Sequence, residues 1–481
     1  MYDSVIPSSN YSQSGESQRI GILAYDYCVG LALASVVLQF GKFGVLPITL
    51  QTVLGILLLL AAPDRVIQAL RLAVRQRFIL VFIVLTFLVN IHTDIRFGVR
   101  FGIIASLGRC VSTVTLVATF IGYCLSHPQR PRRFLTQLLV YLGIAQIWYL
   151  GELVVPDLLV PFRTWLYHEK YVLDAFEANV TVATLTRNTR TGLAPQLHLL
   201  GYLSCAALGL TVSILLSMGI GERVRQYTLV VVTMVVSLLA VSVNLQRSAA
   251  LGAALGTSLL LLSPYRVRLA ARLPFILVLA GLAAAAIVPQ IVASSAQQMD
   301  YENIADKFKT ARDYGFRIQM QVEALRLIMQ APLGLEFQGI SWEETGLTKA
   351  AEVANVKAQK GLAVHNGYLN IGLQYGWPGI ALVIVFLWSI GRAISDCIRR
   401  PMDLSGLRAE AGASIAATCF GLFFVQTLFH NASLFKAEPA SMVLASLLAY
   451  CMISRDIQKK ATARRVAAPR SYIDPTPNAA A

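Results

Sequence analysis

Long apolar runs separated by short polar connections make up most of the chain. A helix needs about 20 residues to cross the roughly 30 Å hydrocarbon core of a bilayer, and many of these runs come close to that length. We predict spans at 20–40, 43–62, 78–93, 103–125, 134–154, 192–219, 227–245, 249–264, 273–293, 366–390, 411–430 and 437–453. The pattern therefore predicts an all-α, polytopic bundle of about 12 transmembrane helices.

The polar segments between and beyond these runs divide the rest of the chain. A polar tail at 1–19 precedes the transmembrane part at 20–453, and a basic tail follows at 454–481. Two connections are long, at 155–191 and 294–365, and we expect the second to carry short helices. Within it, Arg317–Gln330 has apolar residues at helical spacing (Ile318, Val322, Leu325 and Ile328), before Pro332 and Gly334 end the pattern. This pattern predicts an amphipathic helix that lies on or near the membrane face.

The arginines of the short connections predict the orientation. Alternate connections are rich in arginine, as is the C-terminal tail, whereas the opposite short connections carry few basic residues. The rich set contains Arg65, Arg71, Arg75, Arg77, Arg130, Arg132, Arg133, Arg223, Arg225, Arg266, Arg268, Arg272, Arg392, Arg399, Arg400 and Arg408. Cytoplasmic loops of membrane proteins carry this excess. We therefore expect both termini in the cytoplasm and both long loops outside, in the periplasm.

Composition supports a membrane protein. Of the 481 residues, 56% are hydrophobic and 14% are charged, against about 25% charged in soluble proteins. The net charge of +15 follows from the loop arginines, so we predict contact with membrane lipids and none with nucleic acid. The seven cysteines show no CxxC and lie in or beside apolar runs, as small hydrophobic side chains do. No basic segment precedes a short apolar run near the start, so no cleavable signal is expected.

Four residues on the predicted outer side are candidates for chemistry. His365 opens an apolar span and is suited to act as a general base, although a histidine that caps the helix with Asn366 would look the same. Arg247 lies in a very short outward turn, where a guanidinium suits a pyrophosphate or merely reaches lipid headgroups. Arg317 and Arg190 lie in the long loops, where either alone would be read as a solvated charge.

Asp26 and Arg109 are charged residues of opposite sign that fall within predicted spans. At 1.5 Å per residue they differ in depth by roughly 15 Å, which is too far for an ion pair, and Arg109 is instead expected to extend an outward-facing basic pocket. The sequence has no GxxxxGK[ST] loop, no HExxH and no Asp-rich cluster. We therefore predict no metal site and no cofactor, and chemistry on an already activated substrate.

Four motifs, in this order along the chain, resemble the O-antigen ligase and polymerase family of bacterial envelope glycan assembly. The first two are Arg190-Thr191-Gly192 before a span and Arg247-Ser248 at the head of a small-residue span. The other two are Arg317 with a short helix and the turn Ala331-Pro332-Leu333-Gly334, and His365-Asn366-Gly367-Tyr368-Leu369 with Gly376 and Gly379 downstream. The resemblance covers about residues 180–435.

The resemblance implies an inverting, metal-independent glycosyltransferase of the bacterial inner membrane. Its donor would be an oligosaccharide on a polyprenyl pyrophosphate, such as undecaprenyl pyrophosphate, and its acceptor a glycan hydroxyl. Arg247 and Arg317, with Arg190, would bind the leaving pyrophosphate, and His365 would activate the acceptor, with Asn366 and Arg109 as further candidates. A chain-length regulator protein is an expected partner.

Three functional hypotheses remain open from the sequence. We favour a polymerase of exopolysaccharide or O-antigen over a ligase that transfers O-antigen to lipid A core. A secondary transporter has a similar number of spans, but such proteins often contain repeated halves and polar groups near the midplane. We find no repeat between 20–240 and 250–453. A purely structural subunit would leave the placement of the arginines and of His365 unexplained.

Overall fold

A computed structural model describes residues 16–38, 50–96, 102–155, 197–217, 224–244, 247–266, 311–335, 366–404, 406–429 and 439–467, with a few single positions between them. Within these ranges the chain is helical, apart from one isolated bridge between Leu404 and Leu407. The predicted all-α class is therefore confirmed.

Every predicted span except 273–293 coincides with a helix. The helices are α1 (Glu16–Leu38), α2 (Leu50–Ala61), α3 (Pro63–Ala73), α4 (Arg77–Arg96), α5 (Gly102–Ser126), α6 (Arg130–Val154), α10 (Leu197–Ser217), α11 (Val224–Asn244), α12 (Arg247–Ser258), α15 (Ala311–Gln330), α17 (Gly367–Arg399), α18 (Ala409–Phe420) and α19 (Pro439–Ala467). The segment 273–293 lies almost wholly outside the described residues.

Six of these described helices are long and apolar enough to cross a membrane, or seven if α2 and α3 form one bent span. Shorter apolar helices lie at Ala24–Leu38, Arg77–Ile91, Tyr227–Ser242 and Ser248–Leu262. The chain is thus a multi-pass membrane protein, and the total of about 12 spans stays a prediction.

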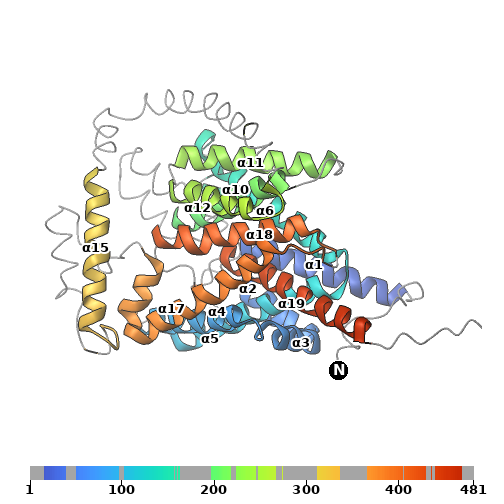
Figure 1. Cartoon of the computed structure of the whole chain (residues 1–481), viewed down its shortest axis with the longest axis horizontal. Helices are drawn as coiled ribbons and strands as arrows, with labels where there is room; N and C mark the ends of the chain where they lie inside the picture. Colours follow the sequence, from blue (N-terminus) through green and yellow to red (C-terminus); the bar gives the residue numbers. More distant parts are fainter. Residues whose placement is uncertain are drawn as a thin grey trace, which may run out of the picture.

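Helix α10 forms the centre of one half of the bundle, because α6, α11, α12 and α18 all pack against it (Figure 1). Beside α10, helix α12 packs closely against α18 and the residues that follow it, because the facing residues are small. A Cβ on Gly256 would lie 2.3 Å from the Ala417 carbonyl oxygen, and one on Gly252 would lie 2.8 Å from that of Gly421. Small residues let helix backbones approach closely in lipid, which fits the Gly- and Ala-rich sequence of α12.

One end of the bundle, here called the arginine end, gathers the residues 74–77, 126–133, 400–408 and 454–467. The Gln76 Nε2 donates to Asp456 Oδ2 at 3.3 Å, and Gln458 Nε2 donates to the Asp403 carbonyl oxygen at 3.1 Å. Gly406, at φ 82°, lies directly against the Pro128 carbonyl. The arginine-rich connections at 74–77, 126–133 and 400–408, and the beginning of the basic tail, therefore lie on one side, as the charge pattern requires.

Asp26 forms its salt bridges at the arginine end. Its carboxylate pairs with Arg130 at 2.8 Å and with Arg133 at 2.9 Å. Asp26 therefore pairs with residues other than Arg109, as the difference in depth predicts. The sequence did not predict Arg130 and Arg133 as its partners, because the span of α6 was expected to begin only at 134.

Three sequence-based expectations need correction. The sequence predicts a short connection between the spans at 43–62 and 78–93, but Pro63–Ala73 within it forms α3, bent by 105° from α2. The span at 366–390 was read as one helix, but α17 continues to Arg399 and is broken at Gly376, where φ is 59°. Helix α19 likewise continues past 453 to Ala467, so part of the basic tail is helical.

At the other end, α15 stands across the ends of the bundle helices (Figure 1). It begins six residues before Arg317 and, as predicted, ends before Pro332. Among its described side chains, Met320, Ala324, Leu327 and Ile328 are buried and pack on the first part of α17. Val322 and Leu325 of the predicted apolar stripe are 59% and 49% exposed. The placement of this helix on or near the membrane face stays a prediction. We call this end of the bundle the Asn366 end, after the residue that begins α17.

Candidate functional site

The helical segment that continues from α18, residues 421–429, is distorted and lies at the Asn366 end. After Phe420 the helix widens into a π turn over Gly421–Val425 and then tightens into a 3-10 turn over Gln426–Phe429. A π turn breaks the regular pairing of backbone carbonyls, and such turns occur often at functional sites. Two of these carbonyls accept hydrogen bonds from side chains. The Tyr368 hydroxyl donates to the Phe423 carbonyl oxygen, and the Thr427 hydroxyl donates to the Leu422 carbonyl oxygen at 3.0 Å.

The first turn of α17 is fixed against this segment. Asn366 is the N-cap of α17, and its side-chain oxygen accepts from the backbone N–H groups of Tyr368 and Leu369, both at 3.1 Å. The cap satisfies donors that the first helical turn leaves without a partner. Because Tyr368 bonds to Phe423, the beginning of α17 lies beside the π turn.

Helix α12 reaches the same segment from another side. Gly252 lies at Gly421 and Gly256 lies at Ala417, so α12 runs antiparallel to α18. Arg247, the first residue of α12, is five residues before Gly252 and hence about 7.5 Å further toward the Asn366 end. The 3-10 turn at Gln426–Phe429 contacts both α12 and α17. The beginnings of α12 and α17 therefore converge on one distorted segment.

A backbone clasp joins α15 to α17. The turn after α15 places Gly334, at φ 100°, against the Gln374 carbonyl, and the break at Gly376 lies against the Pro332 carbonyl. The Trp377 N–H donates to Pro332 at 2.8 Å, and the Leu335 N–H donates to Leu373 at 3.0 Å. A Cβ on Gly334 or Gly376 would lie 2.1 Å or 2.0 Å from the facing oxygen, so only glycine fits.

This clasp gives a structural meaning to two of the motifs. The Pro-Leu-Gly turn follows the helix that carries Arg317, and Gly376 lies in the helix that follows His365. Their interlocking fixes the position of one helix relative to the other. The turn and the glycine therefore position the two helices relative to one another.

The structure places the candidate residues to different extents. His365 and Arg190 lie outside the described residues, and the side chains of Arg247 and Arg317 do as well, although their backbones lie in α12 and α15. Asn366 is described and is a buried helix cap. Arg109 lies in α5, which packs on α4, while α4 in turn packs on α17. The structure thus brings the helices of Arg247, Arg317 and Asn366 together, with Arg109 one helix away.

Gln426 is a residue at this junction that sequence reasoning missed. Its side chain is fully buried, and neither its amide oxygen nor its amide nitrogen has a hydrogen-bond partner among the described residues. An unpaired buried amide is costly, so such a group calls for an explanation. A polar residue near the end of a predicted span is too common to attract attention in the sequence alone.

The described helices and their junction define a class of protein: a multi-pass helical membrane protein with its candidate site at one end of the bundle. Residues 201–384 match the family model described as O-antigen ligase. The match covers α10, α11, α12, α15 and the beginning of α17, and it confirms the resemblance found in the motifs. This part of the chain is therefore similar to O-antigen ligases, a type of glycan-processing membrane protein. No curated protein matches the chain significantly.

Proposed function

We propose that this protein is a polymerase of bacterial surface polysaccharide, either exopolysaccharide or O-antigen. It transfers glycan from a polyprenyl-pyrophosphate carrier to a sugar hydroxyl at the periplasmic face of the inner membrane, with both of its own termini in the cytoplasm. The observation that carries the proposal is the junction at the Asn366 end. There the beginnings of α12 and α17 meet the distorted segment of α18, and α15 is clasped to α17.

The arginines supply the charge that the leaving group needs. Departure of a pyrophosphate develops negative charge, and fixed cationic donors stabilise it in the transition state. Arg247 begins α12 and Arg317 lies in α15, two helices that lie at the Asn366 end, and in this proposal their guanidinium groups bind the pyrophosphate. Planar guanidinium groups bind phosphate oxygens in pairs, which a lysine ammonium does not do. Arg190 is the third candidate for this role.

His365 supplies the base in this mechanism. Its neutral imidazole accepts the proton of the acceptor hydroxyl while the oxygen attacks the anomeric carbon and the pyrophosphate leaves from the opposite side, which inverts the configuration. The alternative role for His365 was helix capping. Asn366 itself makes both capping hydrogen bonds of α17, which favours the chemical role for its neighbour.

The test of the arginines uses the full chain reconstituted in liposomes with polyprenyl-pyrophosphate-linked oligosaccharide. We expect Arg247→Ala and Arg317→Ala each to abolish product formation and to weaken donor binding. Lysine variants should recover little activity, because a point charge does not replace the planar fork. Arg399→Ala, at an exposed arginine of the other end, is the matched control. Full activity in both lysine variants would contradict the bidentate account.

The test of the base separates turnover from binding. We expect His365→Ala to lower turnover by a factor of about 100 to 10,000, the range for a general base, with donor binding retained. Wild-type activity should also fall as the pH drops and the imidazole becomes protonated, because imidazolium cannot accept a proton. Asparagine is a good helix cap. Near wild-type turnover in His365→Asn would therefore leave His365 with a structural role only.

Two observations distinguish this proposal from its alternatives. An O-antigen ligase would use the same residues but would transfer glycan to lipid A core in the reconstituted assay, whereas a polymerase extends the lipid-linked glycan itself. A secondary transporter would move substrate across sealed liposomes and form no glycosidic bond. We expect a chain-length regulator protein to change the length distribution of the product without being required for transfer.

A further inference from the structure

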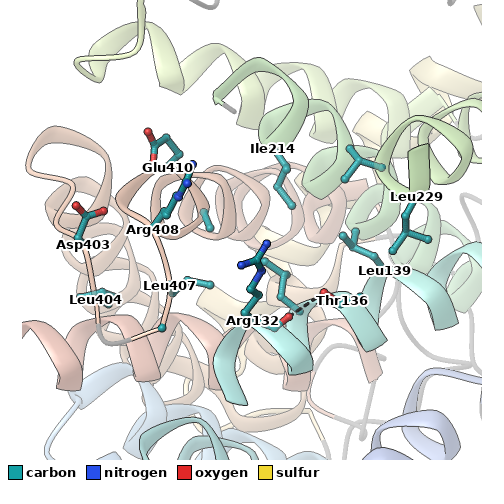
Figure 2. A pocket seen from close by; sticks show the side chains of 14 residues that line it. Arg132, Thr136, Leu139, Ile214, Leu229, Asp403, Leu404, Leu407, Arg408 and Glu410 are labelled. Carbon is teal, nitrogen blue, oxygen red and sulfur yellow. Dashed lines mark hydrogen bonds between the residues drawn. The ribbon is translucent and has the colours of Figure 1, made fainter. Parts of the chain in front are cut away.

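A pocket of about 390 Å³ lies at the arginine end, on the side of the bundle opposite to the candidate site (Figure 2). Helices α6 and α18 both pack on α10, and the pocket lies between them, with α11 contributing a further wall. Nothing in the proposed reaction uses this pocket, because Asn366 and the clasp lie at the other end. Its lining therefore needs an explanation of its own.

The walls change from charged to apolar with depth. On α6, Arg132, Leu135, Thr136 and Leu139 recur at helical spacing, so one face of the helix lines the pocket. Arg132 at the mouth is exposed, whereas Leu135 and Leu139 are buried. Arg132 and Leu139 are separated along the helix axis by about 10 Å. A ligand that fills the pocket must therefore have a polar head and an apolar body.

The mouth carries both signs of charge. Arg132 and Arg408 supply two cations, and Asp403 and Glu410 supply two carboxylates (Figure 2). A purely anionic headgroup would meet the arginines but would also face both acids. A headgroup with a phosphate and an ammonium group complements both pairs, because phosphate binds guanidinium and ammonium binds carboxylate.

The rim loop that carries Asp403 is held firmly in place. Gly406 adopts φ 82° against the Pro128 carbonyl, and a Cβ there would lie 1.3 Å from that oxygen. Gln458 donates to the Asp403 carbonyl at 3.1 Å, and the Asp403 carboxylate accepts from the Ala409 N–H at 2.9 Å. Contacts from the loop before α6, from α18 and from α19 therefore fix the charged mouth before any ligand arrives.

We propose that this pocket is a binding site for a zwitterionic phospholipid with a primary ammonium headgroup, drawn from the leaflet at the arginine end. Its phosphate lies at Arg132 and Arg408, its ammonium lies at Asp403 and Glu410, and an acyl chain lies along Leu135, Leu139 and Ile214. Bound there, the lipid contacts both α6 and α18. It stabilises the bundle without entering the reaction.

The first experiment measures thermal unfolding of the delipidated full chain in detergent with added phosphatidylethanolamine or phosphatidylglycerol. We expect phosphatidylethanolamine to raise Tm and to reach half of its effect at an about fivefold lower concentration, as expected for weak pairs at an exposed mouth. Asp403→Asn with Glu410→Gln should abolish this preference. The matched control, Arg71→Gln with Arg399→Gln, changes exposed arginines outside the pocket and should keep it.

A second measurement needs no variant. A photoactivatable phosphatidylethanolamine should label the wild-type chain at 132–139 and 404–411, and unlabelled phosphatidylethanolamine should compete better than phosphatidylglycerol. Equal effects of the two lipids on wild-type Tm, or labelling confined to other segments, would overturn the proposal. Loss of the preference in the Arg71 and Arg399 control would overturn it too, because general surface charge would then suffice.

Discussion

At the scale of single residues, the junction at the Asn366 end contains buried side chains with hydrogen-bond partners and one, Gln426, without a partner among the described residues. Asn366, Tyr368 and Thr427 each hold a backbone group of the helices around them. Gln426 lies among them with both side-chain polar atoms buried and no partner in the described part of the chain. A group of this kind is a candidate for contact with bound substrate.

We predict that Gln426→Leu separates stability from activity. Leucine has a similar volume and removes an unpaired amide, whose burial costs about 1–3 kcal/mol, so Tm should stay the same or rise. If the amide bonds to substrate, glycan transfer should fall about tenfold, as the loss of one such hydrogen bond implies. Both quantities can be measured on the reconstituted chain.

Thr427→Val is the matched control for this prediction. Thr427 is also fully buried, but its hydroxyl already donates to Leu422. We therefore expect this variant to lower Tm, with no effect on transfer beyond that loss of stability. Unchanged transfer in Gln426→Leu would show that its amide has no role with substrate.

At the scale of elements, the clasp between α15 and α17 explains why the motif glycines must be glycines. Gly376 has φ 59° and ψ −143°, a backbone conformation that residues other than glycine rarely adopt. The turn at Gly334 fits into the break at Gly376, so two helices far apart in the sequence share one rigid joint.

We predict that Gly376→Ala and Gly334→Ala each destabilise the protein by about 2 kcal/mol or more, from backbone strain together with the clash against a carbonyl oxygen. Glycan transfer should fall further than Tm alone explains, because α15 loses its fixed position relative to α17. The Tm in detergent and the rate of transfer in liposomes test the two effects separately.

Gly108 supplies the control for the clasp. It lies in α5, and a Cβ there would meet no atom of the described residues within 4 Å. Gly108→Ala should therefore be neutral or stabilise by about 0.5–1 kcal/mol, the ordinary gain from alanine within a helix. If Gly376→Ala behaved like Gly108→Ala, the clasp would not position α15.

The sequence predicts the elements better than it predicts their joints. Hydrophobic runs identify the helices because each needs a long apolar stretch, and the end of α15 follows from Pro332. Helix α3 was missed because PDRVIQALRLA is too polar for a span, although Pro63 at its first position is a helix-start signal. The pairing of Gly334 with Gly376 depends on tertiary contact, which periodicity does not encode. The same limit hid Gln426 and the partners of Asp26.

At the scale of the whole molecule, the two ends of the bundle differ in character. The arginine end contains the paired Asp26, the loop with Gly406 and the end of α19. The Asn366 end contains the π turn and α15. The excess of arginine predicts that the first end faces the cytoplasm, which would place the junction and the proposed reaction outside.

We predict that single cysteines report this orientation in intact spheroplasts. Of the seven native cysteines, only Cys28 is exposed, so Cys28→Ser provides the background. Gln338→Cys, at an exposed position after α15, should react with a membrane-impermeant maleimide in intact spheroplasts. Lys459→Cys, exposed on α19 at the arginine end, should react only after lysis. Labelling after lysis also shows that each protein is present and that its cysteine is accessible. The reverse pattern would place the junction in the cytoplasm, where a periplasmic acceptor could not reach it, and the proposed reaction would fail together with the topology.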